Sequence, residues 1–438
     1  MRINQSVPAQ RTHEGAKAKH IHPELQLKRS VLACLLWEKQ FYESGESIAD
    51  RISFLAGRCK PEFVAQLAID ARTVYKLRHA PLLLLITLVK VGGKLTEDTI
   101  YHVINRPDEL AELVALYWKD GKRSLPNSMK RGLARAFTKF DEYQLSKWNR
   151  PDAIKLRDVM FLVHPKPKDD EQAAVFKKLA NKELSPPDTW ESRLTAGEDK
   201  KEVFTDLLKR NKLGYMALLR NLRNMLSVGV ELDLIRQRIS ETKGVVLPYR
   251  FIAAAKHAPQ LEPELDQAMI KLMAEAQRLP GKTVLLVDVS YSMHGALSAK
   301  SDLNRLDAAC GLAILLSGIC ESLRVFTFSN DVVEVAPRKG MALRDAVVHS
   351  QNHGGTYLGG AVTYVENLTK MDFDRLIVLT DEQSRDRVPD PKGRGYMINV
   401  ASYKNGVGYG AWRHIDGFSE ACIEFIQQYE TEFDTETH

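Results

Sequence analysis

The sequence predicts a chain of two parts, an all-helical region followed by a smaller α/β domain. Over residues 1–280, apolar side chains recur every three to four positions almost throughout, which is the period of an amphipathic helix. Beyond this region, two short apolar runs each end in an aspartate, as buried strands of a parallel sheet often do. The net charge also changes sign at this boundary, near residue 280. Residues 1–280 contain 47 Lys and Arg against 35 Asp and Glu, a balance of +12, whereas residues 281–438 contain 15 against 21, a balance of −6.

These changes define three predicted regions. Residues 1–26 are expected to be an N-terminal arm, because the segment is polar and lacks the apolar core of a secretory signal. Residues 27–280 form the helical domain and residues 281–438 the α/β domain. The longest apolar stretch is too short to span a bilayer, and five scattered cysteines indicate reduced thiols. We therefore expect a cytoplasmic, monomeric protein with no membrane partner.

The helical domain begins with a series of helices joined by short polar connections. The apolar periodicity predicts helices at residues 29–41, 62–75, 80–91, 97–105 and 109–118. Pairs of helices that recur about every forty residues are typical of an α-solenoid of the HEAT or armadillo type. Since no clean sequence repeat accompanies the pattern, a plain helical bundle is the alternative.

Basic residues gather in two places within the helical domain. In the first cluster, Arg131, Arg135 and Lys139 lie four residues apart and therefore share one helix face, with Lys130 beside it. The second cluster contains Lys209, Arg210, Lys212, Arg220 and Arg223. Such clusters either form solvated helix faces or bind the phosphates of nucleic acid. The balance of +12 favours a polyanion as the ligand of this domain.

Three segments of the α/β domain carry side-chain oxygens that suit a divalent cation. Asp288 ends the first apolar run, and hydroxyls follow it at alternate positions; Thr356 opens an apolar helical run, and Asp381 ends a second strand. Ligands bind α/β sheets at the carboxyl ends of the strands, so these segments should meet there. We expect one site for Mg²⁺ or another divalent cation, formed by Asp288, Ser290, Ser292, Thr356 and Asp381. The alternative is that an acid and some serines cap a helix.

Enzyme interpretations of the same residues are weaker. A haloacid dehalogenase-type phosphotransferase needs a second aspartate where Ser290 stands. The segment 281–283 resembles the end of a P-loop, but it precedes a strand, and Ala276 occupies the position of the first glycine. No Ser-His-Asp, Cys-His or paired-acid set is present, so we expect no enzyme. A metal-dependent nuclease that uses Asp288 and Asp381 is a further alternative.

Two family resemblances add to these expectations. The five oxygen ligands resemble the metal-ion-dependent adhesion site of von Willebrand factor A domains, which implies a doubly wound α/β fold. The segment Asn211-Lys-Leu-Gly-Tyr-Met-Ala-Leu-Leu-Arg-Asn-Leu-Arg-Asn224 resembles the signature of the TROVE module, and Leu247-Pro-Tyr-Arg-Phe251 agrees with it. The order of helices followed by an A domain is that of compact bacterial or phage Ro proteins. This resemblance implies HEAT-like repeats closed into a ring by the A domain.

The Ro resemblance also implies a function. Ro proteins bind small noncoding Y-type RNA on an outer basic surface and single-stranded 3′ ends of misfolded RNA in a central hole. The segment 155–163 is similar to a helix of Ro that contacts Y RNA, which implies RNA contacts at Arg157, His164 and Lys166, although Phe161 stands where a basic residue is expected. For His164, capping or packing of a helix is the alternative role. An RNA-processing enzyme such as an exonuclease is an implied partner.

We therefore interpret the chain as an RNA-binding scaffold. The alternative is a metal-dependent protein-interaction module, in which a carboxylate of the partner completes the shell of the cation and the solenoid serves as a frame. The charge difference separates the two interpretations, because RNA should bind residues 1–280 and a protein partner residues 281–438.

Overall fold

The computed structural model describes most of the chain, namely residues 19–20, 22–32, 45–149, 153–241, 246–297, 302–401, 407–408, 410–419 and 421–436. Its contacts form two compact units. Residues 49–198 make up one unit, and residues 1–48 together with 199–438 make up the other. No helix within the described ranges is both long enough and apolar enough to cross a membrane.

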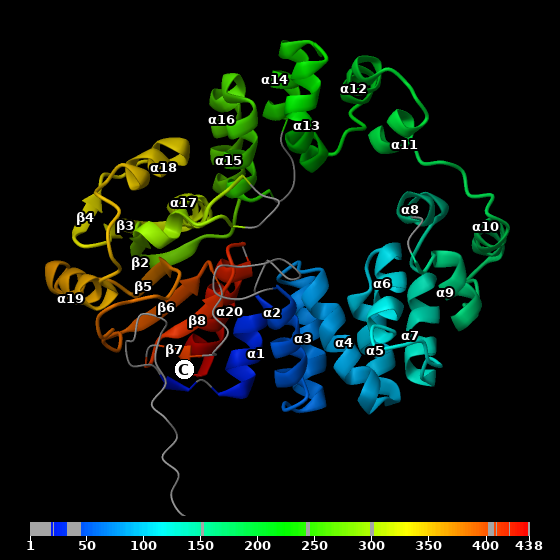
Figure 1. The fold of residues 1–438 in the computed structure, drawn as a ribbon, viewed down its shortest axis with the longest axis horizontal. Helices are drawn as coiled ribbons and strands as arrows, with labels where there is room; N and C mark the ends of the chain where they lie inside the picture. The colour runs from blue at the N-terminus through cyan, green and yellow to red at the C-terminus, as the bar shows by residue number, and fades with distance from the viewer. Residues whose placement is uncertain are drawn as a thin grey trace, which may run out of the picture. The chain divides into compact units, whose positions relative to one another are not determined.

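The unit of residues 49–198 is a succession of helices, most of which pack on near neighbours in the chain. Helix α3 packs on α4 and α5, α5 packs on α7, and α6 and α7 pack on α9 (Figure 1). Helices α3 and α6 begin at prolines, which suit the first helical turn because its N–H groups have no partner within the helix. The helices are α2 (Gly45–Ala56), α3 (Pro61–Thr73), α4 (His79–Val91), α5 (Gly93–Val103), α6 (Pro107–Tyr117), α7 (Asn127–Phe137), α8 (Glu142–Trp148), α9 (Leu156–Val163), α10 (Asp170–Asn181) and α11 (Trp190–Thr195).

Four of the predicted helices are present in this unit as α3 to α6. The helix predicted at residues 29–41 overlaps α1 (Pro23–Val31), and its remainder falls largely outside the described residues. Helix α1 begins within the predicted N-terminal arm, because Pro23 and Glu24 favour a helix start there.

The second unit contains the sheet and the helices that surround it. Its helices before the sheet are α1, α12 (Lys200–Lys209), α13 (Tyr215–Ser227), α14 (Leu232–Ser240), α15 (Pro248–His257) and α16 (Glu262–Ala274). The strand β2 begins at Leu279, close to the predicted boundary at residues 280/281. Contacts nevertheless group α12 to α16 with the sheet, since α15 and α16 pack directly on α17 (Arg305–Ile319).

The six strands of the main sheet follow the order β4-β3-β2-β5-β6-β8 (Figure 1). All neighbouring pairs are parallel except β3 and β4. The order reverses between β2 and β5, which makes this pair the topological switch point of a doubly wound sheet. The strands are β2 (Leu279–Asp288), β3 (Cys320–Phe328), β4 (Val332–Val335), β5 (Arg375–Thr380), β6 (Arg394–Asn399) and β8 (Arg413–Asp416), and a separate short ladder joins β1 (Lys19–His20) to β7 (Val407–Gly408).

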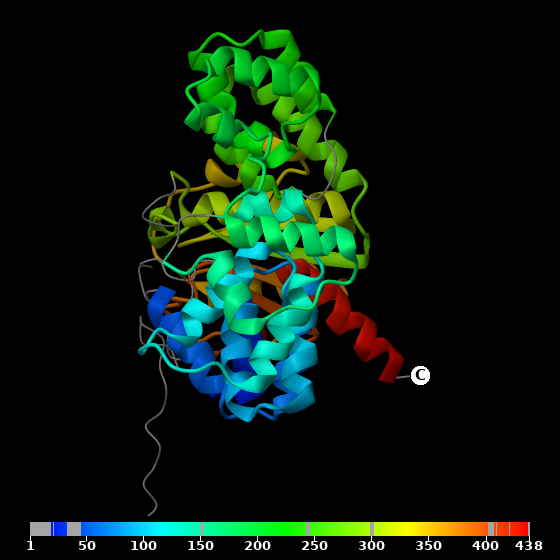
Figure 2. The same cartoon turned by 90° about the vertical axis from the view of Figure 1, so that its right-hand side faces the viewer.

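Helices cover both faces of the sheet. One face packs on α19 (Leu358–Leu368), whose Leu358 and Val362 belong to the same hydrophobic cluster as the alternate residues Val284 and Leu286 of β2. Thr283 points to the opposite face, where Arg375 links it to Glu430 of α20 (Ala421–Glu436). Figure 2 shows α20 (red) projecting from this unit toward the C-terminus. The helix α18 (Gly340–Val348) packs on α17.

Candidate cation site and basic cleft

The predicted cation ligands lie on three loops at the switch point of the sheet. Asp288 is the last residue of β2, and Ser290 and Ser292 lie in the turn that follows it. Asp381 directly follows β5, the strand next to β2. Thr356 precedes α19. The three loops therefore meet where ligands of doubly wound sheets usually bind.

Hydrogen bonds hold the first two loops together. The backbone N–H of Ser290 donates to Asp288 Oδ1 at 2.9 Å, and the hydroxyl oxygens of Ser290 and Ser292 lie 3.2 Å apart. The N–H of Tyr291 donates to the carbonyl oxygen of Gly354 at 3.0 Å. A Cβ at Gly354 would lie 2.2 Å from Asn330 Nδ2, so any side chain there would displace that of Asn330. The loop of Thr356 is thereby fixed against the loop of the two serines.

The electrostatics of this site suit a cation. Asp288 and Asp381 are both fully buried. Burial, and then the nearby charge of Asp381, raises the pKa of Asp288 to about 7, although hydrogen bonds from Ser290 and Thr380 oppose the shift. Because the charge of Asp381 acts on Asp288 in this way, one positive ion between them would be attracted by both carboxylates. Together with three hydroxyls they make a set of hard oxygen donors, which fits Mg²⁺.

Arg305 supplies a positive charge beside the same acids. Its side chain is only 2% exposed, and Nη1 lies 3.4 Å from Asp381 Oδ2. The same nitrogen donates to the carbonyl oxygen of Ser292 at 3.1 Å. Arg305 therefore links the first loop to the third. Among the described residues there is no group of three or more His, Cys, Asp or Glu side chains placed to hold a metal, so any cation here depends on the hydroxyls as well as the two aspartates.

A second candidate site is a cleft of about 460 Å³ between α13 and α15, which lie side by side (Figure 1). We call it the basic cleft. Apolar side chains, including Met216, Leu219 and Leu303, line part of it. The polar lining of the cleft is mostly cationic and includes one acidic residue, Asp302. Its cationic side chains are Arg220, Arg223, Arg250, Lys256 and His257.

The three arginines of the basic cleft are available for an anion. All three are exposed. Within the described part of the chain, neither Arg220 nor Arg223 has an ion pair or hydrogen bond through its side chain, and Arg250 only lies over the ring of Tyr249 at 4.8 Å. Lys256, in contrast, pairs with Asp307 at 2.5 Å.

The first predicted basic cluster has a different environment. Arg131 and Arg135 pair across to Glu97 of α5, each at 3.1 Å, and Arg135 also pairs with Asp98 at 2.5 Å. The Lys139 amine donates to the carbonyl oxygens of Tyr101 and Ile104, at 2.8 Å to the latter. Burial lowers the pKa of Lys139 to about 8. These contacts join α7 and the residues just after it to α5; Lys139 does not share the helix of Arg131 and Arg135 as predicted, because α7 ends at Phe137. Lys130 is half-buried beside them.

Replacing Lys139 with methionine should therefore lower the free energy of unfolding by about 1–3 kcal/mol, because two backbone carbonyls lose their donor. Urea unfolding of the full chain measures the change. Lys130→Met is the matched control, since Lys130 lies on α7, nine residues before Lys139, and has no side-chain partner among the described residues. A Lys139→Met protein of normal stability and weaker RNA binding would instead support the predicted RNA contact.

The remaining predicted RNA contacts are dispersed. Arg157 donates to the carbonyl oxygen of Ala180 at 2.6 Å and lies over the exposed ring of Phe161 at 5.1 Å. His164 takes a left-handed conformation, with φ of 47°, at the C-terminal end of α9. Four of these remaining positions are exposed to solvent, namely His164, Lys166, Lys209 and Arg210. Among them, Arg210 pairs with Asp206 at 2.6 Å.

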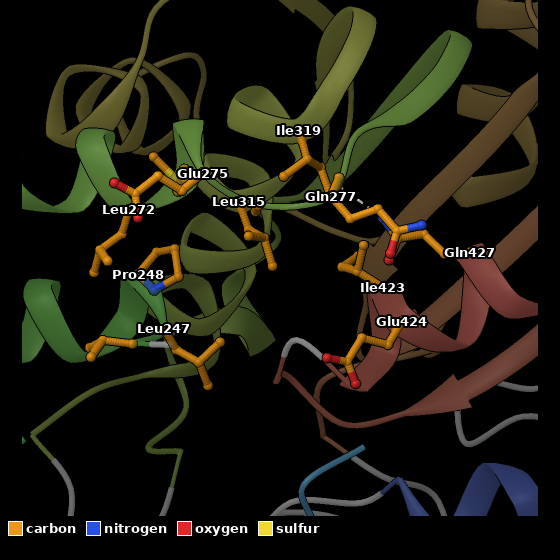
Figure 3. A pocket seen from close by; sticks show the side chains of 13 residues that line it. Leu247, Pro248, Leu272, Glu275, Gln277, Leu315, Ile319, Ile423, Glu424 and Gln427 are labelled. Carbon is orange, nitrogen blue, oxygen red and sulfur yellow. Dashed lines mark hydrogen bonds between the residues drawn. The ribbon is translucent and has the colours of Figure 1, made fainter. Parts of the chain in front are cut away.

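A third hollow in the second unit is apolar. Figure 3 shows this pocket of about 370 Å³, with Leu315 and Ile319 of α17 facing Leu272 of α16 and Ile423 of α20. Its polar rim includes Gln427, whose side-chain amide donates to the carbonyl oxygen of Gln277 at 3.1 Å. None of the predicted site residues lines it.

The sequence prediction included Arg220 and Arg223 but missed the cleft residues on α15. These residues are spread over eight positions and do not form a run of charge. The spacing of the α15 residues was the sequence feature from which their shared helix face could have been predicted. Arg250, Ala253, Ala254 and His257 follow the i, i+3, i+4, i+7 pattern of a single helix face, on which small residues leave room between the two basic ones.

Comparison with known proteins links this region to a family. The model of the TROVE domain matches residues 181–297. This stretch contains α13 and α15, and it extends past the predicted boundary at 280/281 into the loop of Ser290 and Ser292.

Two related sequences are telomerase protein component 1 of Rattus norvegicus and of Mus musculus. The first is 31% identical over 129 residues and the second is 28% identical over 230 residues. These matches cover 28% and 48% of this chain but only 4% and 8% of the two much longer proteins.

A solved structure is similar over nearly the whole chain. The crystal structure of the Deinococcus radiodurans Ro (RSR) protein matches with a TM-score of 0.67, covering 92% of this chain and 98% of that one. At 18% sequence identity, the likeness establishes the fold. The chain therefore has a TROVE domain match at residues 181–297 and shares the fold of a bacterial Ro protein.

Proposed function

We propose that the protein is an RNA-binding scaffold and that the basic cleft is a principal RNA contact. The observation that carries this proposal is the group of exposed arginines on α13 and α15, Arg220, Arg223 and Arg250, within the TROVE match. Unpaired guanidinium groups on a concave surface suit phosphates, which they can bind through two parallel hydrogen bonds. The apolar lining would contact ribose or bases, so a flexible single strand fits the cleft better than a rigid duplex.

The identity of the RNA is part of the proposal. The resemblance to Ro proteins supports small noncoding Y-type RNA and the single-stranded 3′ ends of misfolded RNA as ligands, and it supports a ring of helical repeats with a central hole. In this proposal the chain is not itself an enzyme. It presents RNA to a processing enzyme such as an exonuclease.

We further propose that residues 281–438 form a von Willebrand factor A-type domain that holds Mg²⁺ or another divalent cation. Asp288, Ser290, Ser292, Thr356 and Asp381 would hold the ion, which would supply a positive centre for an anionic ligand. The support is the burial of both aspartates and the raised pKa of Asp288. The ion would neutralise two carboxylates whose charges otherwise repel each other.

The RNA assignment is tested by reversing the charge of the cleft. The triple variant Arg220→Glu, Arg223→Glu and Arg250→Glu should bind an RNA that has a duplex and a single-stranded 3′ tail roughly tenfold or more weakly, because several phosphate contacts are lost. The slope of log affinity against log salt should also become shallower by about 2, at about 0.7 for each of three single-strand contacts. Fluorescence anisotropy over a series of salt concentrations measures both quantities.

The matched control removes equal charge from the same unit outside the cleft. Lys200, Lys201 and Lys271 are exposed lysines on α12 and α16, and their triple replacement with glutamate should change affinity much less. If both triple variants lose the same affinity, net charge and not the cleft binds the RNA. If a blunt duplex binds as well as the tailed RNA, the cleft does not select single strands.

A further inference from the structure

Aromatic side chains surround the candidate cation site, and the proposed function does not use them. Tyr291 is 77% exposed and Tyr357 is 42% exposed. The ring of His294 is also exposed, and His353 is half-buried. We call Tyr291, His294, His353 and Tyr357 the aromatic rim. Large exposed rings beside a buried polar site are suited to contact a flat ligand group.

Hydrogen bonds and ring contacts fix one side of the rim to the cation loops. Tyr291 lies between the candidate ligands Ser290 and Ser292. The rings of His294 and His353 meet edge to face with centroids 4.5 Å apart, and the ring of Tyr291 lies 6.4 Å from that of His294. His353 Nδ1 lies 2.5 Å from the carbonyl oxygen of Val289. These rings are therefore held at the mouth of the first cation loop.

Tyr357 forms the other side of the rim. It directly follows the candidate ligand Thr356, and its ring lies against Gly355, where an added Cβ would come within 3.3 Å of Tyr357 Cε2. The same Cβ would lie 3.3 Å from Arg385 Nη1, and the backbone N–H of Arg385 donates to the carbonyl oxygen of Thr356 at 2.9 Å. The rim thus combines aromatic faces with a positive charge.

The rim is joined through the backbone to the basic cleft. Leu303 lines the cleft, and its carbonyl oxygen accepts from the N–H of Leu297 at 2.9 Å. The N–H of Arg305 donates to the carbonyl oxygen of Gly295, which directly follows His294 in the chain, at 3.1 Å. The segment that follows His294 is therefore joined by backbone hydrogen bonds to the segment that contains Leu303, a residue that lines the basic cleft.

We propose that the cation site and the aromatic rim together bind one nucleotide of a single-stranded RNA. A phosphate oxygen is a hard ligand that can complete the shell of a divalent cation. An unpaired base can stack on Tyr291 or Tyr357, and stacking of this kind accepts any base. The proposal rests on the proposed RNA and cation binding, and it extends the RNA surface to residues 281–438, beyond the helical region that the charge balance favours. A carboxylate of a partner protein would use the cation but would have no need of exposed rings.

A fluorescent RNA tests this proposal directly. The probe is a short single-stranded oligoribonucleotide that contains 2-aminopurine, whose fluorescence falls when the base stacks. With Mg²⁺ present, the wild-type protein should quench the probe, and chelation of the ion should restore most of the signal. The double variant Tyr291→Ala and Tyr357→Ala should bind this probe roughly tenfold or more weakly, since a stacked ring is lost. Tyr291→Phe and Tyr357→Phe should retain binding, because phenylalanine keeps the aromatic face.

The outcomes separate this proposal from the proposed function. Binding that depends on Arg220, Arg223 and Arg250 but not on Mg²⁺ or the tyrosines would overturn the nucleotide site and leave the RNA-binding scaffold intact. Absence of RNA binding in the wild type would overturn both. Tighter Mn²⁺ binding in the presence of a peptide with a free carboxylate, without the same effect of the RNA probe, would assign the cation site to a protein ligand and overturn the nucleotide site. Circular dichroism of each variant verifies the fold.

Discussion

Replacing Arg29 with methionine should lower the free energy of unfolding by about 3–5 kcal/mol, because two buried carboxylates lose their cation. Arg29 of α1 donates to Asp416 Oδ1 at 2.8 Å and to Glu382 Oε2 at 2.5 Å, and all three side chains are at most 3% exposed. Burial would raise the pKa of Glu382, but the charges of Arg29 and His414 outweigh burial and lower it. Urea unfolding of the full chain, followed by circular dichroism, measures the loss.

The matched control for this prediction is Lys28→Met. Lys28 precedes Arg29 on the same helix, is only half-buried, and has no side-chain partner within the described residues. Its replacement should change stability by less than about 0.5 kcal/mol, as is usual for surface positions. If the Arg29→Met protein unfolds at the same urea concentration as the control, the network does not anchor α1.

The Asp288→Asn protein should lose measurable Mg²⁺ binding, a weakening of more than roughly a hundredfold, since loss of groups outside the ligand shell alone costs about 10–100-fold. Without divalent ions it should be at least as stable as the wild type. The reason is that Asp288 is buried beside Asp381 and its charged form is disfavoured there. Titration calorimetry with Mg²⁺, and thermal unfolding with and without the ion, measure the two effects.

Asp331→Asn is the matched control for the cation prediction. Asp331 is exposed and lies just after β3, so the variant removes one negative charge near the carboxyl edge of the sheet without touching the candidate ligands. It should keep both Mg²⁺ binding and the stabilisation by Mg²⁺. If Asp288→Asn also keeps them, the ion binds elsewhere and the five oxygens serve only to organise the loops.

Local sequence patterns determine how much of this molecule can be predicted. The ligand loops are accessible to prediction because a buried parallel strand is a nearly continuous apolar run, and its end marks where a ligand group emerges. The sequence alone therefore places Asp288 and Asp381 at strand ends, and these two strands are neighbours in the sheet. The helices α3 to α6 are accessible for a similar reason, since their periodicity is strong and prolines mark two of their starts.

The environments of the basic residues could not be predicted in the same way. Arg131 and Arg135 form a convincing stripe on one helix, but Glu97 lies 34 residues before the first of them and pairs with both through the packing of α5 and α7. The basic cleft shows the opposite case. Arg223 and Arg250 come from different helices, and only the contact of α13 with α15 brings them to one surface. Charge along a sequence therefore does not reveal which charges remain available to a ligand.

The anchoring of α1 has a consequence for how the protein folds during synthesis. Arg29 and Asp416 are separated by 387 residues, so α1 leaves the ribosome long before its buried partner exists. Residues 49–198 form a continuous compact unit and can fold soon after they emerge, because domains generally fold as units from the N-terminus onward. The second unit, in contrast, cannot complete the packing of α1 until β8 has been synthesised. A chaperone that shields α1, or a pause in translation before β8, would act on this late closing step.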